Sequence, residues 1–183
     1  GDAEPSAAIS VALGSVRLTE RHFRNDPPTA AEGSAAAADI DAALAQAGRQ
    51  LPVGEARTIV GVAGSITTVT AHALGLTHYD RAAVNGARLT PLQIHRACDE
   101  LLRAPRGVRE TLGFLHPGRI DVIAAGALIW SRVLDWVAQH MTSAGSSLEH
   151  IYTSEHDILD GIALSLFSQH HHSSGGGVTD PAS

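Results

Sequence analysis

The sequence contains no lysine, so all 13 of its basic side chains are arginines. With 19 acidic residues they leave a net charge of −6 at neutral pH, which argues against a surface that binds nucleic acid. The planar guanidinium of arginine suits phosphate oxygens better than an ammonium group does. A biased genome composition explains the missing lysines equally well, so the arginines by themselves identify no ligand.

Cysteine and aromatic residues are also scarce. The single Cys98 excludes an intrachain disulfide and favours a reducing compartment, so we expect a cytoplasmic protein. Aromatic residues make up 4% of a chain that is 44% hydrophobic, which predicts an aliphatic, alanine-rich core. No signal peptide follows Gly1, and Arg132 and Asp135 interrupt the longest apolar helix, so we expect no membrane span. The 183 residues suffice for one domain.

The most informative stretch begins with a short, β-branched apolar run, Ile59–Ala63, which predicts a buried strand. Gly64–Ser65 then turns the chain, and Thr67 or Thr68 can cap a helix that ends at Leu74. Unpaired amide groups at a helix N-terminus favour a bound anion, and glycine lets the backbone approach it closely. The same pattern describes an ordinary strand-to-helix connection, and spacing alone favours that simpler interpretation.

The other elements follow from hydrophobic periodicity and turn residues. Before the central stretch we expect a strand over 8–13, a strand or a helical turn over 16–21, a linker over 25–33 and a helix over 35–48. After it we expect a loop through 79–86, a helix from Thr90 to Pro105, and a helix opened by Gly118 that is apolar over 120–141. The chain should end with a strand over 148–153, a helix over 158–166 capped by Ser154 and Asp157, and a histidine-rich tail from Ser168.

Two features of this pattern leave alternatives open. The arginines at 103, 106, 109 and 119 either line an anionic channel or form a solvated face, and the solvated face is favoured. The helix over 120–141 is apolar on two faces, so it is either a core helix or a seam with a partner helix, and a core helix is favoured. Its small residues Ala124–Ala127 would allow a close approach of another backbone or of a ligand.

The order of these elements predicts an α/β layer structure with additional helices, but it identifies no reaction. The sequence has no P-loop, no nucleophile elbow and no cysteine–histidine spacing typical of a metal site. The three histidines of the tail are more typical of an expression tag or a disordered end than of metal ligands.

Four segments, in this order, resemble the exopolyphosphatase / guanosine pentaphosphate phosphohydrolase (Ppx/GppA) family. They are LGSVRLTE (13–20), VGVAGSITT (60–68), GRIDVIAAGAL (118–128) and TSEHDILDGIA (153–163). The high alanine and arginine content is similar to that of actinobacterial members. The resemblance spans Ile9 to Leu166, which is nearly the whole predicted folded part.

The resemblance implies a ribonuclease-H-like domain of the actin/hexokinase/Hsp70 superfamily, with a mixed sheet flanked by helices. Residues 8–167 would form the second such domain, without its first strands, between a disordered or cut end (1–7) and a disordered tail (168–183). The family's second phosphate-binding loop maps onto Gly64, Ser65, Ile66, Thr67 and Thr68. Arg17 and Arg119 are implied as possible substrate contacts, although Arg17 can instead hold the loop by pairing with Glu20 or Asp121.

The resemblance also implies a phosphoanhydride hydrolase. Such enzymes release terminal phosphate from polyphosphate or guanosine pentaphosphate by Mg²⁺-assisted attack of water, and full-length members are expected to be homodimers that bind neither nucleic acid nor membrane. The family's first phosphate loop and its catalytic glutamate are not in this sequence. We therefore expect no catalytic residue here, Mg²⁺ ligands mostly outside the chain, and no hydrolysis by the chain alone.

Two other functions remain open at this point. The chain is alternatively a non-catalytic phosphate-binding or dimerisation module that uses the helix over 120–141 as its interface. A sugar-kinase-like protein is a third possibility, but it requires an adenosine pocket around Ala124–Ala127, and the sequence shows no specific sign of one.

Overall fold

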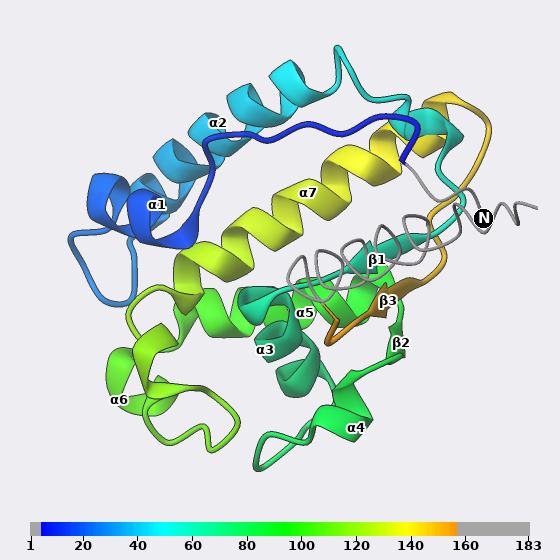
Figure 1. Cartoon of the computed structure of the whole chain (residues 1–183). Helices are drawn as coiled ribbons and strands as arrows, with labels where there is room; N and C mark the ends of the chain where they lie inside the picture. The colour runs from blue at the N-terminus through cyan, green and yellow to red at the C-terminus, as the bar shows by residue number, and fades with distance from the viewer. Residues whose placement is uncertain (1–4, 157–183) are drawn as a thin grey trace, which may run out of the picture.

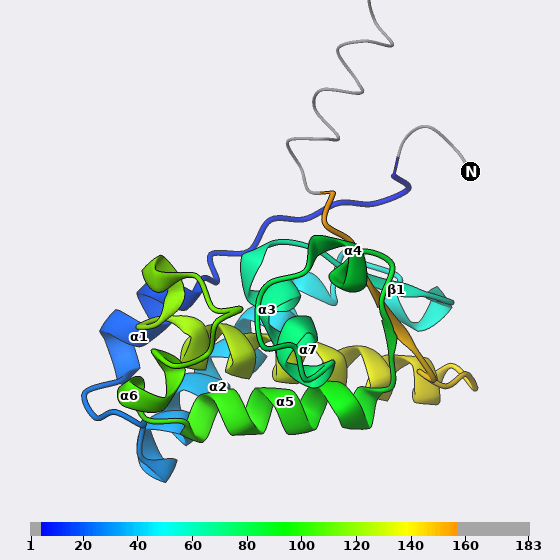
Figure 2. The ribbon, with the colours of Figure 1, turned by 90° about the horizontal axis from the view of Figure 1, so that it is seen from below.

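The computed structural model describes residues 5–156, and a single long helix, α7 (Ile123–Ser143), organises them (Figure 1). Helices α1 (Ser15–His22) and α2 (Ala30–Ala47) pack on one side of α7, and α3 (Gly64–Ala73) and α5 (Pro91–Arg103) pack on the other. Figure 2 shows α5 on the side of α7 that lies away from the extended N-terminal segment. The shorter pieces are α4 (Arg81–Val84), α6 (Arg106–Arg109), and the 3₁₀ turns η1 (Val53–Glu55) and η2 (Pro117–Arg119).

Three short strands form a mixed sheet in the order β1-β3-β2. β1 (Ile59–Gly61) runs parallel to β3 (Ile151–Thr153), and β2 (Arg88–Leu89) pairs with β3 in the antiparallel direction. The predicted mixed sheet flanked by helices is therefore confirmed. The predicted strand over 148–153 is shorter than expected, and the predicted loop over 79–86 contains α4.

The central helix is a core element, as predicted. Nine of its residues are buried, and it contributes to both hydrophobic clusters of the described chain. It begins at Ile123 rather than at Gly118, because residues 117–119 form the 3₁₀ turn η2. Its small residues do admit another element: a Cβ built on Gly126 would lie 2.4 Å from the Ser65 hydroxyl oxygen. α3 therefore packs against α7 at its first turn.

Capping residues set the starts of two helices. Thr29 and Glu32 form a capping box that starts α2 at Ala30, so the predicted start at residue 35 and the predicted linker through Gly33 are wrong. The start was missed because the prediction used the apolar periodicity, and the residues of the capping box are polar. Thr90 and Gln93 form the same motif ahead of Pro91, which confirms the predicted start of α5.

The predicted strand over 8–13 is wrong, because these residues join no strand in the described part of the chain. Alternation of apolar residues indicates an extended backbone, but a strand also needs a hydrogen-bonded neighbour. The following segment, left open as strand or helical turn, is helix α1. The predicted helix over 158–166, its cap residue Asp157 and the tail from Ser168 lie outside the described residues.

Candidate functional site

The junction between β1 and α3 has an unusual backbone. Ala63 has φ 74° and ψ 167°, a region that glycine adopts readily and residues with a Cβ rarely do. This conformation turns the chain so sharply that α3 begins at Gly64. The predicted cap at Thr67 or Thr68 is therefore wrong, since both residues lie inside the helix. Strain of this kind is typically found at ligand sites.

Only part of the predicted phosphate-binding loop offers free amide groups. The carbonyl of Ala63 accepts hydrogen bonds from the amides of Ile66 and Thr67, each at 3.1 Å. The amides of Gly64 and Ser65 have no hydrogen-bond partner within residues 5–156, and no side chain caps this helix. The donors left for an anion are thus these two amides, at the positive end of the helix dipole.

The side chains of the loop have structural roles. The hydroxyls of Thr67 and Thr68 donate to the carbonyl of Gly64, at 3.3 and 2.7 Å, and Thr68 is completely buried. Ser65 packs against Gly126, and Ile66 packs against Gly61. The sequence pattern correctly placed this stretch at a helix N-terminus, but the hydroxyls of Thr67 and Thr68 bond to the helix backbone.

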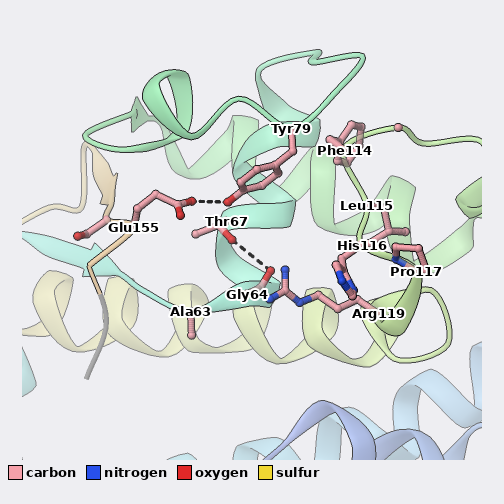
Figure 3. A pocket seen from close by; sticks show the side chains of 12 residues that line it. Ala63, Gly64, Thr67, Tyr79, Phe114, Leu115, His116, Pro117, Arg119 and Glu155 are labelled. Carbon is pink, nitrogen blue, oxygen red and sulfur yellow. Dashed lines mark hydrogen bonds between the residues drawn. The ribbon is translucent and has the colours of Figure 1, made fainter. Parts of the chain in front are cut away.

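A cavity of about 480 Å³ opens in front of this junction (Figure 3). Arg119 reaches into it from the η2 turn: a Cβ built on Gly64 would lie 2.1 Å from its Nη2 atom, so the guanidinium rests directly on the first turn of α3. The guanidinium of Arg119 makes no ion pair or hydrogen bond with any residue of the described chain. The cavity therefore combines the free amide of Gly64 with an unpaired guanidinium, whereas Ser65, whose amide is also free, is not one of its lining residues.

The opposite wall carries a carboxylate whose charge is compensated. The Tyr79 hydroxyl donates to the Glu155 carboxylate, Arg81 lies 3.5 Å from the same carboxylate, and the Glu155 amide donates to Asn85. Burial, followed by the hydrogen bond to Glu155, raises the pKa of Tyr79 above its ordinary value. Glu155 thus leaves the positive character of Arg119 largely intact.

Sequence reasoning did not find several lining residues. Tyr79, Phe114 and His116 come from loops far from the Gly64 junction in the sequence, and only packing brings them to the cavity. The one local signal was the pair His116–Pro117, since a side-chain acceptor followed by proline is typical of a helical N-cap. The full lining comprises Ala63, Gly64, Thr67, Tyr79, Gly113, Phe114, Leu115, His116, Pro117, Arg119, Ser154 and Glu155.

The structure separates the two arginines implied as substrate contacts. Arg119 lines the cavity, whereas Arg17 lies in a different groove beside α2 and forms no ion pair with Glu20 or Asp121 in the described chain. Of the arginines considered for a channel, only that at 119 reaches this cavity. The others pair with nearby carboxylates: Arg103 with Asp99, Arg106 with Glu110 and Asp121, and Arg109 with Asp26.

The residues present do not suit the Mg²⁺ ion implied by the resemblance. No group of three or more His, Cys, Asp or Glu side chains converges within residues 5–156, and Glu155 is the one carboxylate lining the cavity. Mg²⁺ is usually held by one or two carboxylates together with waters and substrate phosphates. The one carboxylate here, that of Glu155, is already bonded to Tyr79 and lies near Arg81. In the same described region, no helix is both long and apolar enough to cross a bilayer.

Comparisons with known proteins identify relatives of the chain. The chain is 41% identical over 166 residues to Exopolyphosphatase 2 of Mycobacterium tuberculosis, and the match covers 91% of the chain and 50% of that protein. It superposes on the crystal structure of an exopolyphosphatase-like protein with a TM-score of 0.88 and 43% identity, covering 90% of the chain and 51% of that structure.

A crystal structure of an Aquifex aeolicus Ppx/GppA protein matches with a TM-score of 0.74 and 28% identity, covering 90% of the chain and 49% of that structure. The chain thus spans about half the length of the curated relatives it matches. The model of the Ppx/GppA phosphatase family matches residues 1–158, so the chain belongs to the Ppx/GppA phosphatase family.

Proposed function

We propose that the chain is part of a phosphoanhydride hydrolase of the exopolyphosphatase type, to which it contributes one phosphate-binding site. The observation that carries this proposal is the contact of the Arg119 guanidinium with the first turn of α3, where the free amide of Gly64 lines the same cavity and the amide of Ser65 is also free. Helix N-termini and guanidinium groups are the two common protein ligands for phosphoryl oxygens. The exopolyphosphatase relatives support the same substrate class.

In this site the chain binds and orients the substrate. The amides of Gly64 and Ser65 would hold oxygens of a phosphoryl group, and Arg119 would balance its charge. Fixed donors of this type also stabilise the charge that develops on phosphoryl oxygens in the transition state. Polyphosphate and guanosine pentaphosphate present the same terminal group, so the site accommodates either, in keeping with the two substrates that the resemblance implies.

We infer that residues 8–167 form the second of two actin-like domains and that the chemistry is completed elsewhere. The described residues provide no Mg²⁺ site and no unpaired carboxylate in the cavity to act as a base for water. The metal ligands and the catalytic glutamate would come from a first domain that faces this cavity. A homodimer of the full-length protein and a cytoplasmic location remain part of this proposal.

The alternative of a dimerisation module built on the long helix has less support. The apolar residues of α7 are covered by α1, α2, α3 and α5 of the same copy, so this helix presents no free apolar seam. The alternative of a phosphate-binding module without catalysis shares the same site. It differs only in the absence of a catalytic partner domain.

Replacement of Arg119 tests the proposal. If its guanidinium contacts the anion, Arg119→Ala removes a charge-assisted hydrogen bond and weakens binding of tripolyphosphate by roughly 10- to 100-fold. Arg96 is the matched control, because it is exposed on α5, is outside the cavity, and changes the net charge equally when replaced by alanine. Affinity is measured by isothermal titration calorimetry on the 183-residue chain. Equal losses in the two variants would mean that the site does not bind the anion.

A further inference from the structure

The ring of His116 is anchored by its own turn. His116 is the N-cap residue of η2, and its Nδ1 atom accepts a hydrogen bond from the amide of Gly118 at 3.1 Å. An amide can only donate, so Nδ1 must be the unprotonated nitrogen. The neutral ring therefore carries its proton on Nε2. The tautomer is determined by backbone geometry, as is often observed for histidines that bind ligands through the second nitrogen.

The remaining ring nitrogen has no competing partner in the part of the chain that the structure describes. His116 lines the same cavity as Arg119, three residues further along the chain, and is exposed. Figure 3 shows the two side chains together on the wall opposite Glu155. The Nε2 atom has no hydrogen-bond or ion-pair partner within residues 5–156. Glu155, the one acidic lining residue, is already bonded to Tyr79 and lies near Arg81.

We propose that the Nε2–H group of His116 is a further donor to the bound phosphoryl group. This inference rests on the proposed function, and it adds a substrate-contacting residue that the loop motif does not include. The donor is available in the neutral ring, so it requires no protonated histidine. Protonation would instead place a hydrogen on Nδ1 and remove the bond from Gly118. With the neutral ring, Arg119 and His116 would hold the anion from the η2 turn, and Gly64 and Ser65 would hold it from the N-terminus of α3.

A pair of variants separates the proposed contact from the capping role. Serine is a good N-cap residue, so His116→Ser can still accept from Gly118 but cannot reach the ligand. His116→Ala loses both functions. The phosphoryl acceptor is ionised, so the lost hydrogen bond is charge-assisted, and both variants should bind tripolyphosphate roughly 10- to 100-fold more weakly than the unaltered chain. Only His116→Ala should also lower the midpoint of thermal unfolding. If His116→Ser binds with unchanged affinity, His116 is a cap alone and the inference is wrong.

Nuclear magnetic resonance gives a second, independent measurement on the same chain. Long-range proton–nitrogen spectra of the neutral ring should show the proton on Nε2, and this nitrogen should shift when tripolyphosphate is added. A proton on Nδ1 would overturn the inference at once. If the Gly64 and Ser65 amides shift while the His116 nitrogen does not, this inference fails and the phosphate site stands. If none of the three responds, the proposed function fails as well.

Discussion

The contact between Gly64 and Arg119 allows a sharp test of the site without altering any charged residue. A Cβ at position 64 would lie 2.1 Å from Nη2, 2.2 Å from Cζ and 2.5 Å from Nε of Arg119. All three distances are shorter than any real carbon contact, so in the Gly64→Ala variant the guanidinium must leave the first turn of α3. The flexible side chain can swing away, so the fold should survive.

The two expected effects have opposite signs. Alanine is preferred over glycine in a helix by up to about 1 kcal/mol, so Gly64→Ala should not lower the free energy of unfolding. Loss of a charge-assisted hydrogen bond to the ligand is worth about 1.5–3 kcal/mol, which corresponds to a roughly 10- to 100-fold weaker affinity for tripolyphosphate. A stable variant with poor binding is therefore expected, and calorimetric titration together with urea unfolding measures both quantities.

Controls decide whether Arg119 is the cause. Gly33 is also helical, and a Cβ at its position meets nothing within 4 Å, so Gly33→Ala should change stability alone. If Gly64→Ala acts by displacing Arg119, it should weaken binding no further in an Arg119→Ala background. Unchanged affinity in Gly64→Ala, or full additivity of the two substitutions, would refute the reasoning.

Three further predictions concern strain, acid stability and catalysis. Ala63→Gly relieves a backbone conformation that costs about 1–3 kcal/mol, but glycine also loses more chain entropy on folding. The free energy of unfolding in urea should therefore rise by roughly 1 kcal/mol. A decrease would show that Ala63 is unstrained. Backbone amides of Thr29 and then Arg24 lower the pKa of Glu32 from 4.5 to about 2, so its stabilising effect is complete above pH 4.5 and is lost as the pH falls through 2. Glu32→Gln should therefore flatten the pH dependence of the unfolding midpoint in this window, and an unchanged slope would contradict the assignment. Finally, the 183-residue chain should release no phosphate from polyphosphate, and clear Mg²⁺-dependent turnover would show that a partner domain is unnecessary.

The local parts of the fold were predictable because their signals lie within a few neighbouring residues. The run from Ile59 predicted a strand, but β1 ends at Gly61 and exposes Val60, so the expected buried strand through Ala63 is wrong in its length and burial. The pair Thr90–Pro91 predicted the start of α5. Two predicted helix boundaries were wrong because of another local motif. The capping box of Thr29 and Glu32 starts α2 earlier than the apolar pattern predicted, and the 3₁₀ turn η2 makes α7 begin later than Gly118.

The sequence by itself determined the family, the strand–glycine–helix junction and the presence of amide donors around Gly64. Tertiary structure decided which donors remain free, because the strained turn at Ala63 commits the amides of Ile66 and Thr67 to its own carbonyl and leaves those of Gly64 and Ser65 free. It also selected Arg119 over Arg17, and it brought His116 and Glu155 to the same cavity. His116, Arg119 and Glu155 are all distant from Gly64 in the sequence. The close packing of α3 on α7 at Gly126 holds α3 in place, and no local spacing of residues encodes this contact.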